Sequence, residues 1–440
     1  MPGTAAGAVA GAGSWRYGAG VDLDGSDWWF RCRVPDATTS AADGGVGAPL
    51  VFEATLVFEG LATVADVFVA GRPVAHSENM FVPVRVALAE IHAGDEIAVR
   101  CAALGQLLDR RRPRPRWKTQ MANHQSLRWF RTTLLGRQPG WTVTPPPVGP
   151  WRPVRLERAG APAVVERRVV ARGDDDGSGV VEVRVRLAGG DPGVDDVRVT
   201  VRRHQADTDG GAGAEHGAIV GVGSLAARTD GGGVVIEGEL AVAGIAWWWP
   251  HTHGAQPLYD VAVEVGGERL ALGRVGFRRV ELDRGDGAFA LAVNGVPVFC
   301  RGACWWPVDP VGMAADDDAL RRTLELVRDA HMNMVRIPGG TVYEDARFLD
   351  LCDELGIMVW QDAMLGYTDP PEDEEFTAEV VAELRHVFGG LGGRPALAVV
   401  CGGQEIEEQA ALFGLARSSW GCPLTEKTIP ALAAELLPGV

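Results

Sequence analysis

The last third of the sequence alternates between short apolar segments and longer amphipathic ones. The apolar segments begin near residues 298, 332, 357 and 396, and a segment with helical periodicity follows each of them. Strand–helix units of this size are typical of a parallel β/α structure. A closed (β/α)8 TIM barrel needs eight such units in roughly 250 residues. The part of the chain from residue 298 to the end provides four units, so we expect the first half of a barrel.

Polar or aromatic side chains stand at the ends of all four predicted strands. The carboxyl ends of parallel barrel strands share one face, where catalytic residues lie, so we expect these side chains to converge. Aromatic rings, one arginine and two carboxyl groups on a single face suit a neutral polyol such as a sugar. Two other interpretations stay open. Arg336 and Asp362 can instead form a salt bridge that joins adjacent strands, and Glu405 can instead be a solvated residue in a turn. The six candidate residues are Trp305, Trp306, Arg336, Asp362, Gln404 and Glu405.

The sequence before residue 276 has a different pattern, in which short alternating strands are separated by Gly- and Asp-rich turns. In residues 15–158 this pattern predicts an antiparallel sandwich or jelly roll. In residues 162–275 it predicts an immunoglobulin-like β-sandwich that contains no polar constellation and serves as a spacer or brace. Residues 276–440 are assigned to the partial (β/α)8 barrel. Residues 1–14 are interpreted as a flexible Ala/Gly tail, because they lack the basic and apolar regions of a signal peptide.

The composition narrows the possible partners and the cellular compartment. The chain has 42 Lys and Arg against 58 Asp and Glu, a net charge of −16, which argues against a nucleic acid or an anionic membrane as partner. The basic run at residues 110–118 contains two prolines and is interpreted as a surface loop. The seven cysteines are scattered and form no CxxC pair, so we expect a cytoplasmic protein without disulfides. No pattern indicates a metal ion or another cofactor.

Motifs spread over the chain resemble those of one family. Residues 27–30, 58–71 and 77–81 are similar to its sugar-binding jelly roll, and residues 248–260 are similar to its sandwich. The sequence resembles glycoside hydrolase family 2, most closely the β-mannosidase-like branch, from about residue 15 to the end. Many matches in one order make the resemblance specific. Those in the predicted barrel lie at residues 276–282, 293–307, 332–336, 343–345, 351–362 and 400–405.

The resemblance implies a retaining exo-β-glycosidase that hydrolyses terminal β-linked sugars. Glu405 aligns with the general acid/base, which protonates the leaving oxygen and then activates water to hydrolyse a glycosyl-enzyme intermediate. Gln404 stands where the family usually has an Asn that hydrogen-bonds the sugar 2-hydroxyl. Three further residues fall on positions that line or brace the sugar subsite, namely Arg336, Asp362 and Trp305.

Four features depart from the family pattern. Retention requires a second carboxylate about 5–5.5 Å from the first, and the family's nucleophile lies on strand seven, beyond the four strands predicted here. The acidic residues that follow Glu405 are expected on or beside one helix, which cannot face Glu405 across a barrel. Gln404 replaces Asn, and Pro338 replaces a Trp of the sugar subsite. Residues 127–141 replace a Trp-Asp-Trp loop through which the jelly roll usually reaches the sugar.

These departures leave three functions open. The first is a β-mannosidase-like enzyme, and the second is another family 2 exo-β-glycosidase acting on galactosides, glucuronides or glucosaminides. The third is a catalytically inactive carbohydrate-binding relative or fragment. The first and fourth strands of a half-barrel would be open edges. We therefore expect self-association through these edges, or a second chain that completes the barrel.

Overall fold

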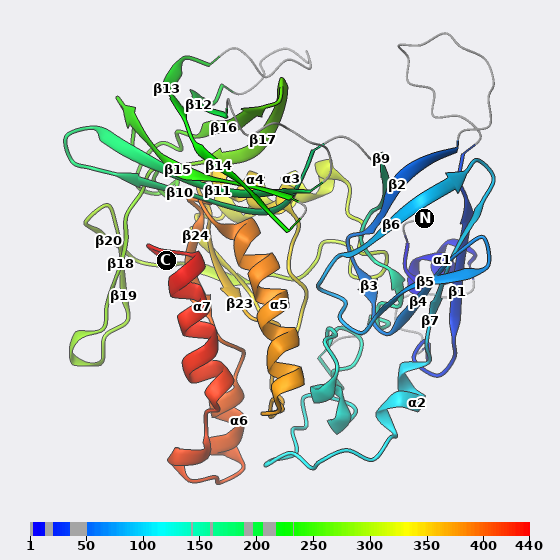
Figure 1. Cartoon of the computed structure of the whole chain (residues 1–440). Coiled ribbons are helices and arrows are strands. Elements are labelled where there is room, and N and C mark those ends of the chain that lie inside the picture. The colour runs from blue at the N-terminus through cyan, green and yellow to red at the C-terminus, as the bar shows by residue number, and fades with distance from the viewer. Residues whose placement is uncertain are drawn as a thin grey trace.

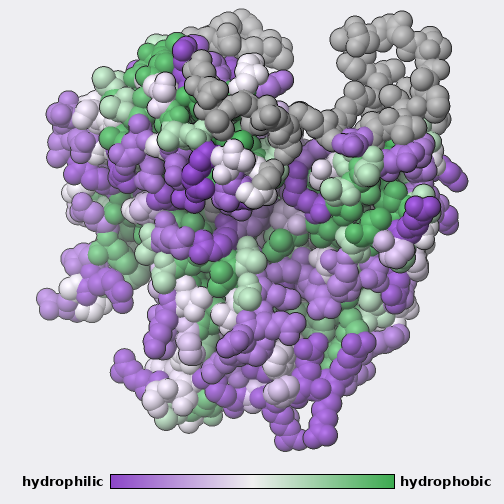
Figure 2. Space-filling model, in the orientation of Figure 1, coloured by the Kyte–Doolittle hydropathy of each residue, from purple (hydrophilic) through white to green (hydrophobic). Residues whose placement is uncertain are grey.

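The computed structural model describes residues 3–13, 21–35, 51–141, 144–158, 162–188, 197–205, 217–231 and 233–440. The predicted start of the jelly roll at residue 15 lies outside the described residues. Three β-containing parts follow one another along the chain: the first spans residues 28–158, the second residues 163–275 and the third residues 280–436. The third part contains most of the helices (Figure 1). Hydrophilic residues cover most of the face shown in Figure 2. No helix in the described ranges is long and apolar enough to cross a membrane.

The first part contains two antiparallel sheets that pack over one apolar core. In β4, every second residue is buried, which is the alternation expected of a half-buried strand. The core joins Leu56 and Val86 from one sheet with Val67 and Val99 from the other. One sheet has the order β1 (Trp28–Arg33), β7 (Glu96–Cys101), β4 (Ala65–Val69), β5 (Arg72–Ser77), and the other β6 (Val84–His92), β2 (Val51–Phe58), β9 (Val154–Arg158). Smaller elements are the paired strands β3 (Leu61–Ala62) and β8 (Gly149–Pro150), helix α2 (Leu104–Leu108) and a 3-10 helix (Gln125–Trp129).

The second part is a sandwich of two four-stranded antiparallel sheets. Its core is almost entirely aliphatic: one sheet contributes Val183 and Ile236, and the other contributes Val199 and Val261. Strand β11 pairs with a neighbour on each side over most of its length, which makes it the centre of its sheet. One sheet has the order β10 (Ala163–Gly173), β11 (Ser178–Ala188), β15 (Gly233–Ala243), β14 (Ala226–Asp230), and the other β13 (Ile219–Ser224), β12 (Arg198–Arg203), β16 (Tyr259–Val265), β17 (Glu268–Val275).

The third part contains the parallel sheet that the alternation of segments predicts. Its strands lie side by side in chain order: β21 (Gly302–Cys304), β22 (Met334–Ile337), β23 (Met358–Asp362) and β24 (Leu397–Cys401). The helices between them are α3 (Asp317–Asp329), α4 (Ala346–Leu355) and α5 (Glu374–Leu391). Helix α4 ends at Gly356, whose φ of 68° lies in the left-handed region that glycine adopts most easily. The sheet is preceded by β18 (Val280–Asp283), a 3-10 helix (Gly285–Gly287), β19 (Ala290–Val293) and β20 (Val296–Val298).

The acidic residues after Glu405 do not share one helix, which corrects the expectation from the sequence. Four short elements follow β24 because Gly414 and Gly421 interrupt the helical pattern. The elements are α6 (Ile406–Leu412), a 3-10 helix (Arg417–Ser419), a π-helical turn (Leu424–Thr428) and α7 (Ile429–Leu436). Accordingly, the acidic side chains are divided among α6 (Glu407, Glu408), the π-helical turn (Glu426) and α7 (Glu435).

The predicted flexible tail is wrong for residues Ala5–Gly11, which form helix α1. Alanine has the highest intrinsic helix propensity, and the side chain of Thr4 caps the helix by accepting the N–H of Gly7 at 3.0 Å. Tertiary contacts stabilise the helix further. Ala5 and Ala6 are buried, and the Thr4 hydroxyl donates to the carbonyl oxygen of Val311 at 2.7 Å.

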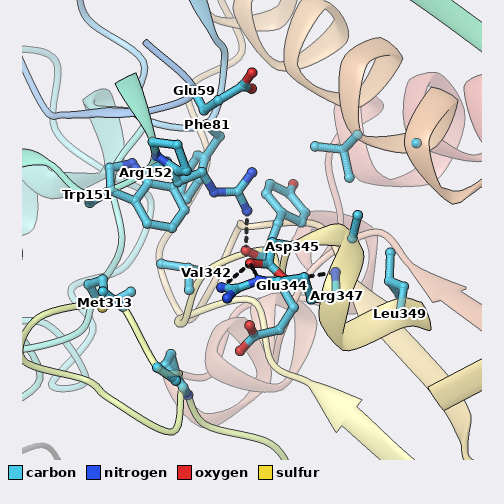
Figure 3. Close-up of a pocket in the computed structure, with 18 of the residues that line it drawn as sticks. Glu59, Phe81, Trp151, Arg152, Met313, Val342, Glu344, Asp345, Arg347 and Leu349 are labelled. Carbon is cyan, nitrogen blue, oxygen red and sulfur yellow. Dashed lines mark hydrogen bonds and ion pairs between the residues drawn. The ribbon is translucent and has the colours of Figure 1, made fainter. Parts of the chain in front are cut away.

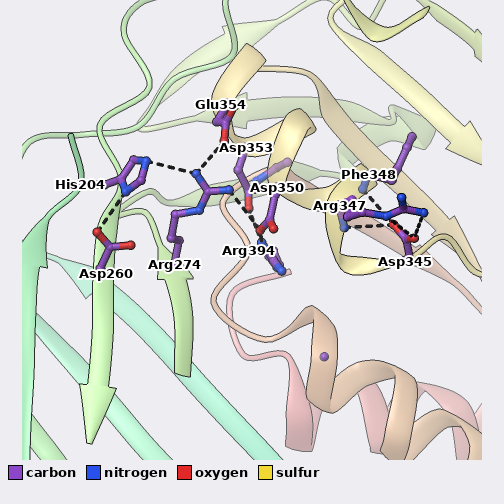
Figure 4. A network of polar contacts seen from close by, with 12 residues as sticks. His204, Asp260, Arg274, Asp345, Arg347, Phe348, Asp350, Asp353, Glu354 and Arg394 are labelled. Carbon is purple, nitrogen blue, oxygen red and sulfur yellow. Dashed lines mark hydrogen bonds and ion pairs between the residues drawn. The ribbon is translucent and has the colours of Figure 1, made fainter. Parts of the chain in front are cut away.

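A polar network joins the sandwich to helix α4 (Figure 4). From β17, Arg274 donates to Glu354 at 2.7 Å and lies 3.3 Å from Asp350. His204 contacts Arg274 with one ring nitrogen, and its other ring nitrogen lies 3.0 Å from Asp260. Two carboxylates of α4 therefore neutralise an arginine of the sandwich, and these ion pairs join the two parts of the chain.

Asp353 is the fully buried carboxylate of the same region. It accepts from Arg394 at 3.1 Å and from the backbone N–H of Ala396 at 2.9 Å. Burial nevertheless raises the pKa of Asp353 from 3.8 to about 6. The folded state therefore holds this proton more tightly than the unfolded chain does.

We expect the free energy of unfolding to fall as the pH rises from about 4 to 6, because over this interval the unfolded chain releases the Asp353 proton while the folded state keeps it. The expected contribution is on the order of 1–3 kcal/mol. Urea unfolding at the two ends of this interval measures it, and Asp353→Asn should flatten the dependence. The exposed substitution Asp318→Asn on α3 is the matched control. An equally steep dependence in Asp353→Asn would contradict the assignment.

Candidate functional site

Arg336 and Asp362 form the salt bridge that was one of the two interpretations of this pair. Arg336 in β22 places Nη2 2.7 Å from Oδ2 of Asp362 at the end of β23, and Nε donates to the same oxygen at 3.2 Å. The backbone N–H of Gly339 also donates to Asp362 at 3.2 Å. Asp362 is fully buried, so desolvation raises its pKa while the guanidinium opposes the shift. The side chain of Arg336 remains 30% exposed and can contact a ligand.

Gln404 is buried directly after β24, and its amide has protein partners on both sides. The amide oxygen accepts the backbone N–H of Gly340 at 3.0 Å, and the amide nitrogen donates to the hydroxyl of Tyr367. The neighbouring Gly339 lets the backbone pass close to these segments, because a Cβ there would lie 2.6 Å from the carbonyl oxygen of Ala363 and 3.2 Å from Cβ of Gln404. The group that the resemblance assigns to a sugar hydroxyl is thus already held in one orientation by the protein.

Glu405 precedes helix α6 with a positive φ of 54°. A left-handed conformation is costly for a residue with a Cβ, and such strain concentrates at functional sites. The carboxylate makes no capping hydrogen bond to α6. Burial first, and then the charge of Glu408, raise the pKa of Glu405, whereas a hydrogen bond from Gln404 and the charge of Arg336 lower it. A raised pKa favours the protonated carboxyl group that a general acid needs.

The two tryptophans at the end of β21 have different environments. Trp305 is 6% exposed, packs on Phe348 with ring centroids 4.9 Å apart, and donates from Nε1 to Glu344 at 2.8 Å. Tertiary packing therefore leaves this ring no open face for a sugar. The resemblance implied that Trp305 lines or braces the sugar subsite, and its burial favours bracing. Trp306 is 38% exposed and keeps an accessible face.

Residues 127–141 reach the strand ends from the first part of the chain. The backbone N–H of Leu134 donates to the carbonyl oxygen of Gly340 at 3.1 Å. Tyr367 belongs to an apolar cluster whose other buried members all come from the first part. Burial raises the pKa of Tyr367 to about 12, and a hydrogen bond with Gln138 opposes the shift. Neither Tyr367 nor Gln138 was predicted as a site residue: Tyr367 stands outside the predicted strand ends, and Gln138 comes near Tyr367 only because the loop of residues 127–141 docks here.

A second contact of the first part clamps the segment after β23. Buried Asp369 accepts from Nε and Nη2 of Arg116 at 2.9 and 2.7 Å, and Arg128 lies 3.4 Å away. The basic run at residues 110–118 lies largely at the surface as predicted, and Arg116 uses its charge for this internal contact. Across the described ranges, no group of three or more His, Cys, Asp or Glu side chains is placed to hold a metal ion.

Residues 21–152 match a family model described as the glycosyl hydrolase 2 galactose-binding domain-like family. The β-mannosidase of Capra hircus is 40% identical over 177 residues, which cover 38% of this chain and 20% of that protein. The β-mannosidase B of Aspergillus fumigatus is 30% identical over 378 residues, which cover 81% of this chain and 42% of that protein. The longer of these two alignments extends well beyond the galactose-binding-like domain.

Solved structures share the fold. The β-D-mannosidase of Dictyoglomus thermophilum superimposes with a TM-score of 0.83 at 23% identity, covering 100% of this chain and 54% of that one. The exo-chitosanase CsxA of Amycolatopsis orientalis superimposes with a TM-score of 0.60 at 18% identity, covering 90% and 44%. The chain thus spans about half, or less, of the length of these relatives. Its resemblance to the β-mannosidase-like branch of glycoside hydrolase family 2 is confirmed by these similarities in sequence and fold.

Proposed function

We propose that this chain carries the acid/base side of a retaining exo-β-glycosidase that acts on terminal β-linked sugars, with β-mannosides as the first candidates. The observation that carries the proposal is Glu405, a strained and partly buried carboxyl group with a raised pKa at the end of β24. The names of the relatives, β-mannosidases, support the sugar. In this proposal the three parts are a jelly roll (15–158), an immunoglobulin-like sandwich (162–275) and the first half of a (β/α)8 barrel (276–440), in a cytoplasmic protein.

In the proposed mechanism, protonated Glu405 donates its proton to the glycosidic oxygen as the bond to the sugar breaks. The resulting carboxylate then removes a proton from the water that hydrolyses the glycosyl-enzyme intermediate. Arg336 and Asp362 fix the floor of the subsite, and Gln404 and Tyr367 fix the backbone from which Glu405 projects. Trp306 would supply an aromatic face for the sugar.

The nucleophile is proposed to come from a segment outside these 440 residues that completes the barrel. Among the described strands, β21 pairs only with β22 and β24 only with β23, so both outer strands have a free edge. All three residues of β21 are exposed, as is Phe299 just before it, at 81%. Free edges with apolar neighbours readily accept further strands.

A non-catalytic carbohydrate-binding protein is the second candidate. The buried amide of Gln404 favours it, because its hydrogen bonds with Gly340 and Tyr367 restrain it from turning toward a sugar hydroxyl. The fold shared with an exo-chitosanase keeps a glucosaminide-acting enzyme as a variant of the first candidate.

The test is hydrolysis of a panel of 4-nitrophenyl β-glycosides by this chain, alone and together with a polypeptide that supplies the four remaining β/α units. The panel contains the mannoside, galactoside, glucuronide and glucosaminide. We expect release of nitrophenol from the mannoside by the completed barrel. Preference for another sugar would replace the mannoside assignment. Glycan binding that persists in Glu405→Gln, with no turnover by the completed barrel, would establish the non-catalytic alternative.

A further inference from the structure

A cavity of about 780 Å³ lies between the first part and the third (Figure 3). Phe81, Trp151 and Arg152 line it from the first part, and Val342 and Glu344 line it from the segment before α4. None of the predicted site residues contributes to its wall. The volume is within the range of small-molecule sites, which occur preferentially where domains meet.

The cavity contains a guanidinium group without a direct counter-charge. Arg152 lies over the ring of Trp151, with Cζ 4.5 Å from the ring centroid. Its Nη2 donates to the backbone carbonyl oxygen of Tyr343 at 2.6 Å, and it forms no ion pair with any carboxylate of the described residues. Burial lowers the pKa of Arg152, and carboxylates help only from a longer distance. An arginine in this state has donors and charge left for a ligand.

The nearby carboxylates are already committed to other partners. Asp345 accepts from Arg347 and caps helix α4, and Glu59 pairs with Arg155. Glu344 accepts only one hydrogen bond, from the indole of Trp305 at 2.8 Å. Burial raises the pKa of Glu344 to about 7, so this carboxyl group is mostly neutral below that pH.

The wall contains a second arginine, Arg167, that has no ion-pair partner among the described residues. Arg167 enters from the sandwich and donates to the carbonyl oxygens of Leu272 and Gly390, at 2.7 and 3.4 Å. It forms no ion pair within the described residues, and burial lowers its pKa as well. Below pH 7 the charged groups of the wall that lack an ion-pair partner, Arg152 and Arg167, are therefore positive. The remaining wall beside Trp151 is largely apolar.

We propose that this cavity is a binding site for a small organic anion, whose carboxylate or phosphate group Arg152 holds while its apolar body packs against the partly exposed Val308 and Met313. The site requires neither the nucleophile nor the completed barrel, so it goes beyond the proposed hydrolase and does not depend on it. A guanidinium group binds both kinds of oxyanion through paired N–H donors. The apolar wall selects anions that carry a hydrophobic group over inorganic ions.

The first experiment is isothermal titration of the 440-residue chain with benzoate, phenyl phosphate and the neutral benzyl alcohol at pH 6. We expect saturable binding of at least one anion, about tenfold weaker binding of the alcohol, and a similar loss for the anion in Arg152→Gln. The anion that binds more tightly shows whether the site prefers a carboxylate or a phosphate group. Arg322→Gln, which removes an exposed arginine of α3, is the matched control and should bind as the wild type does. Arg152→Lys keeps the positive charge and serves as a second variant in case Arg152→Gln misfolds.

A pH series distinguishes this site from non-specific anion binding. Affinity should fall between pH 6 and 8 as Glu344 ionises beside the bound anion, and Glu344→Gln should remove most of that fall. The other charged or titratable residues that line the cavity are Arg152, Arg167, Arg347, Arg394, Glu59, Asp309, Asp345, Tyr343 and His386. Burial lowers the pKa of His386, which favours its neutral form. Equal affinity in Arg152→Gln and the wild type, or no saturable binding up to about 10 mM of either anion, would overturn the proposal.

Discussion

Glu405→Gln is expected to slow hydrolysis of alkyl β-glycosides by the completed barrel by about 10²–10⁴-fold. An amide has the shape of the carboxylic acid but can neither donate the proton to the leaving oxygen nor activate water. The loss should depend on the leaving group. A 2,4-dinitrophenyl group departs without protonation, so the bond-breaking step should be nearly unaffected with that substrate, and pre-steady-state release of dinitrophenol measures this step.

The control for this prediction is Glu407→Gln. Glu407 is an exposed residue on α6, two positions further along the chain, and the substitution changes the net charge by the same amount. It should leave hydrolysis unchanged. An equal loss in the two variants, or an equal loss for alkyl and dinitrophenyl substrates in Glu405→Gln, would contradict the assignment of Glu405 as the acid/base.

The second large effect is expected at the buried ion pair that joins the first part to helix α5. Arg131 is 3% exposed and donates to the fully buried Glu383 at 2.7 and 2.8 Å. Tyr343 and Asn79 donate to the same carboxylate, at 2.8 and 3.2 Å. Arg131→Met should lower the free energy of unfolding by about 3–5 kcal/mol, because it leaves a buried carboxylate without its counter-charge. Denaturant unfolding, followed by circular dichroism, measures the loss.

Arg385→Met is the matched control for the buried pair. Arg385 lies on the same helix and pairs with Glu435 at 2.9 Å, but both side chains are about half exposed. Exposed pairs of this kind contribute between about 0 and 1 kcal/mol. The double substitution Arg131→Met with Glu383→Leu should recover part of the stability, since no charge then remains buried. A loss in Arg131→Met no larger than in Arg385→Met would show that the pair does not hold the two parts together.

Local features of the sequence predicted the order of the elements in the third part. The alternation of apolar and amphipathic segments depends on side chains that are neighbours along the chain, and it correctly predicted four parallel strands in chain order. The same reasoning explains the end of α4 at Gly356 and the convergence of Arg336 with Asp362 on adjacent strand ends. These positions follow from strand register and the two-residue period of side chains.

Local pattern was misleading where packing between distant segments decides the outcome. The alanine-rich start of the chain favours a helix locally, but so short a helix is marginal without tertiary contacts, and Thr4 bonds to Val311, more than 300 positions away. Trp305 is buried although it ends a strand, because Phe348 covers its ring. No periodicity in the sequence encodes either contact.

The sequence by itself thus determined the types and order of the elements and the residues that stand at the strand ends. Only the tertiary structure decided which of those residues are free and which are already bound. Gln404 is held by Tyr367 and Gly340, and the loop of residues 127–141 docks on the same turn. Arg152 lacks a counter-charge because Asp345 and Glu59 have other partners. The physical reason is that periodicity acts over a few residues, whereas hydrogen-bond partners and burial depend on segments that meet only in the folded chain.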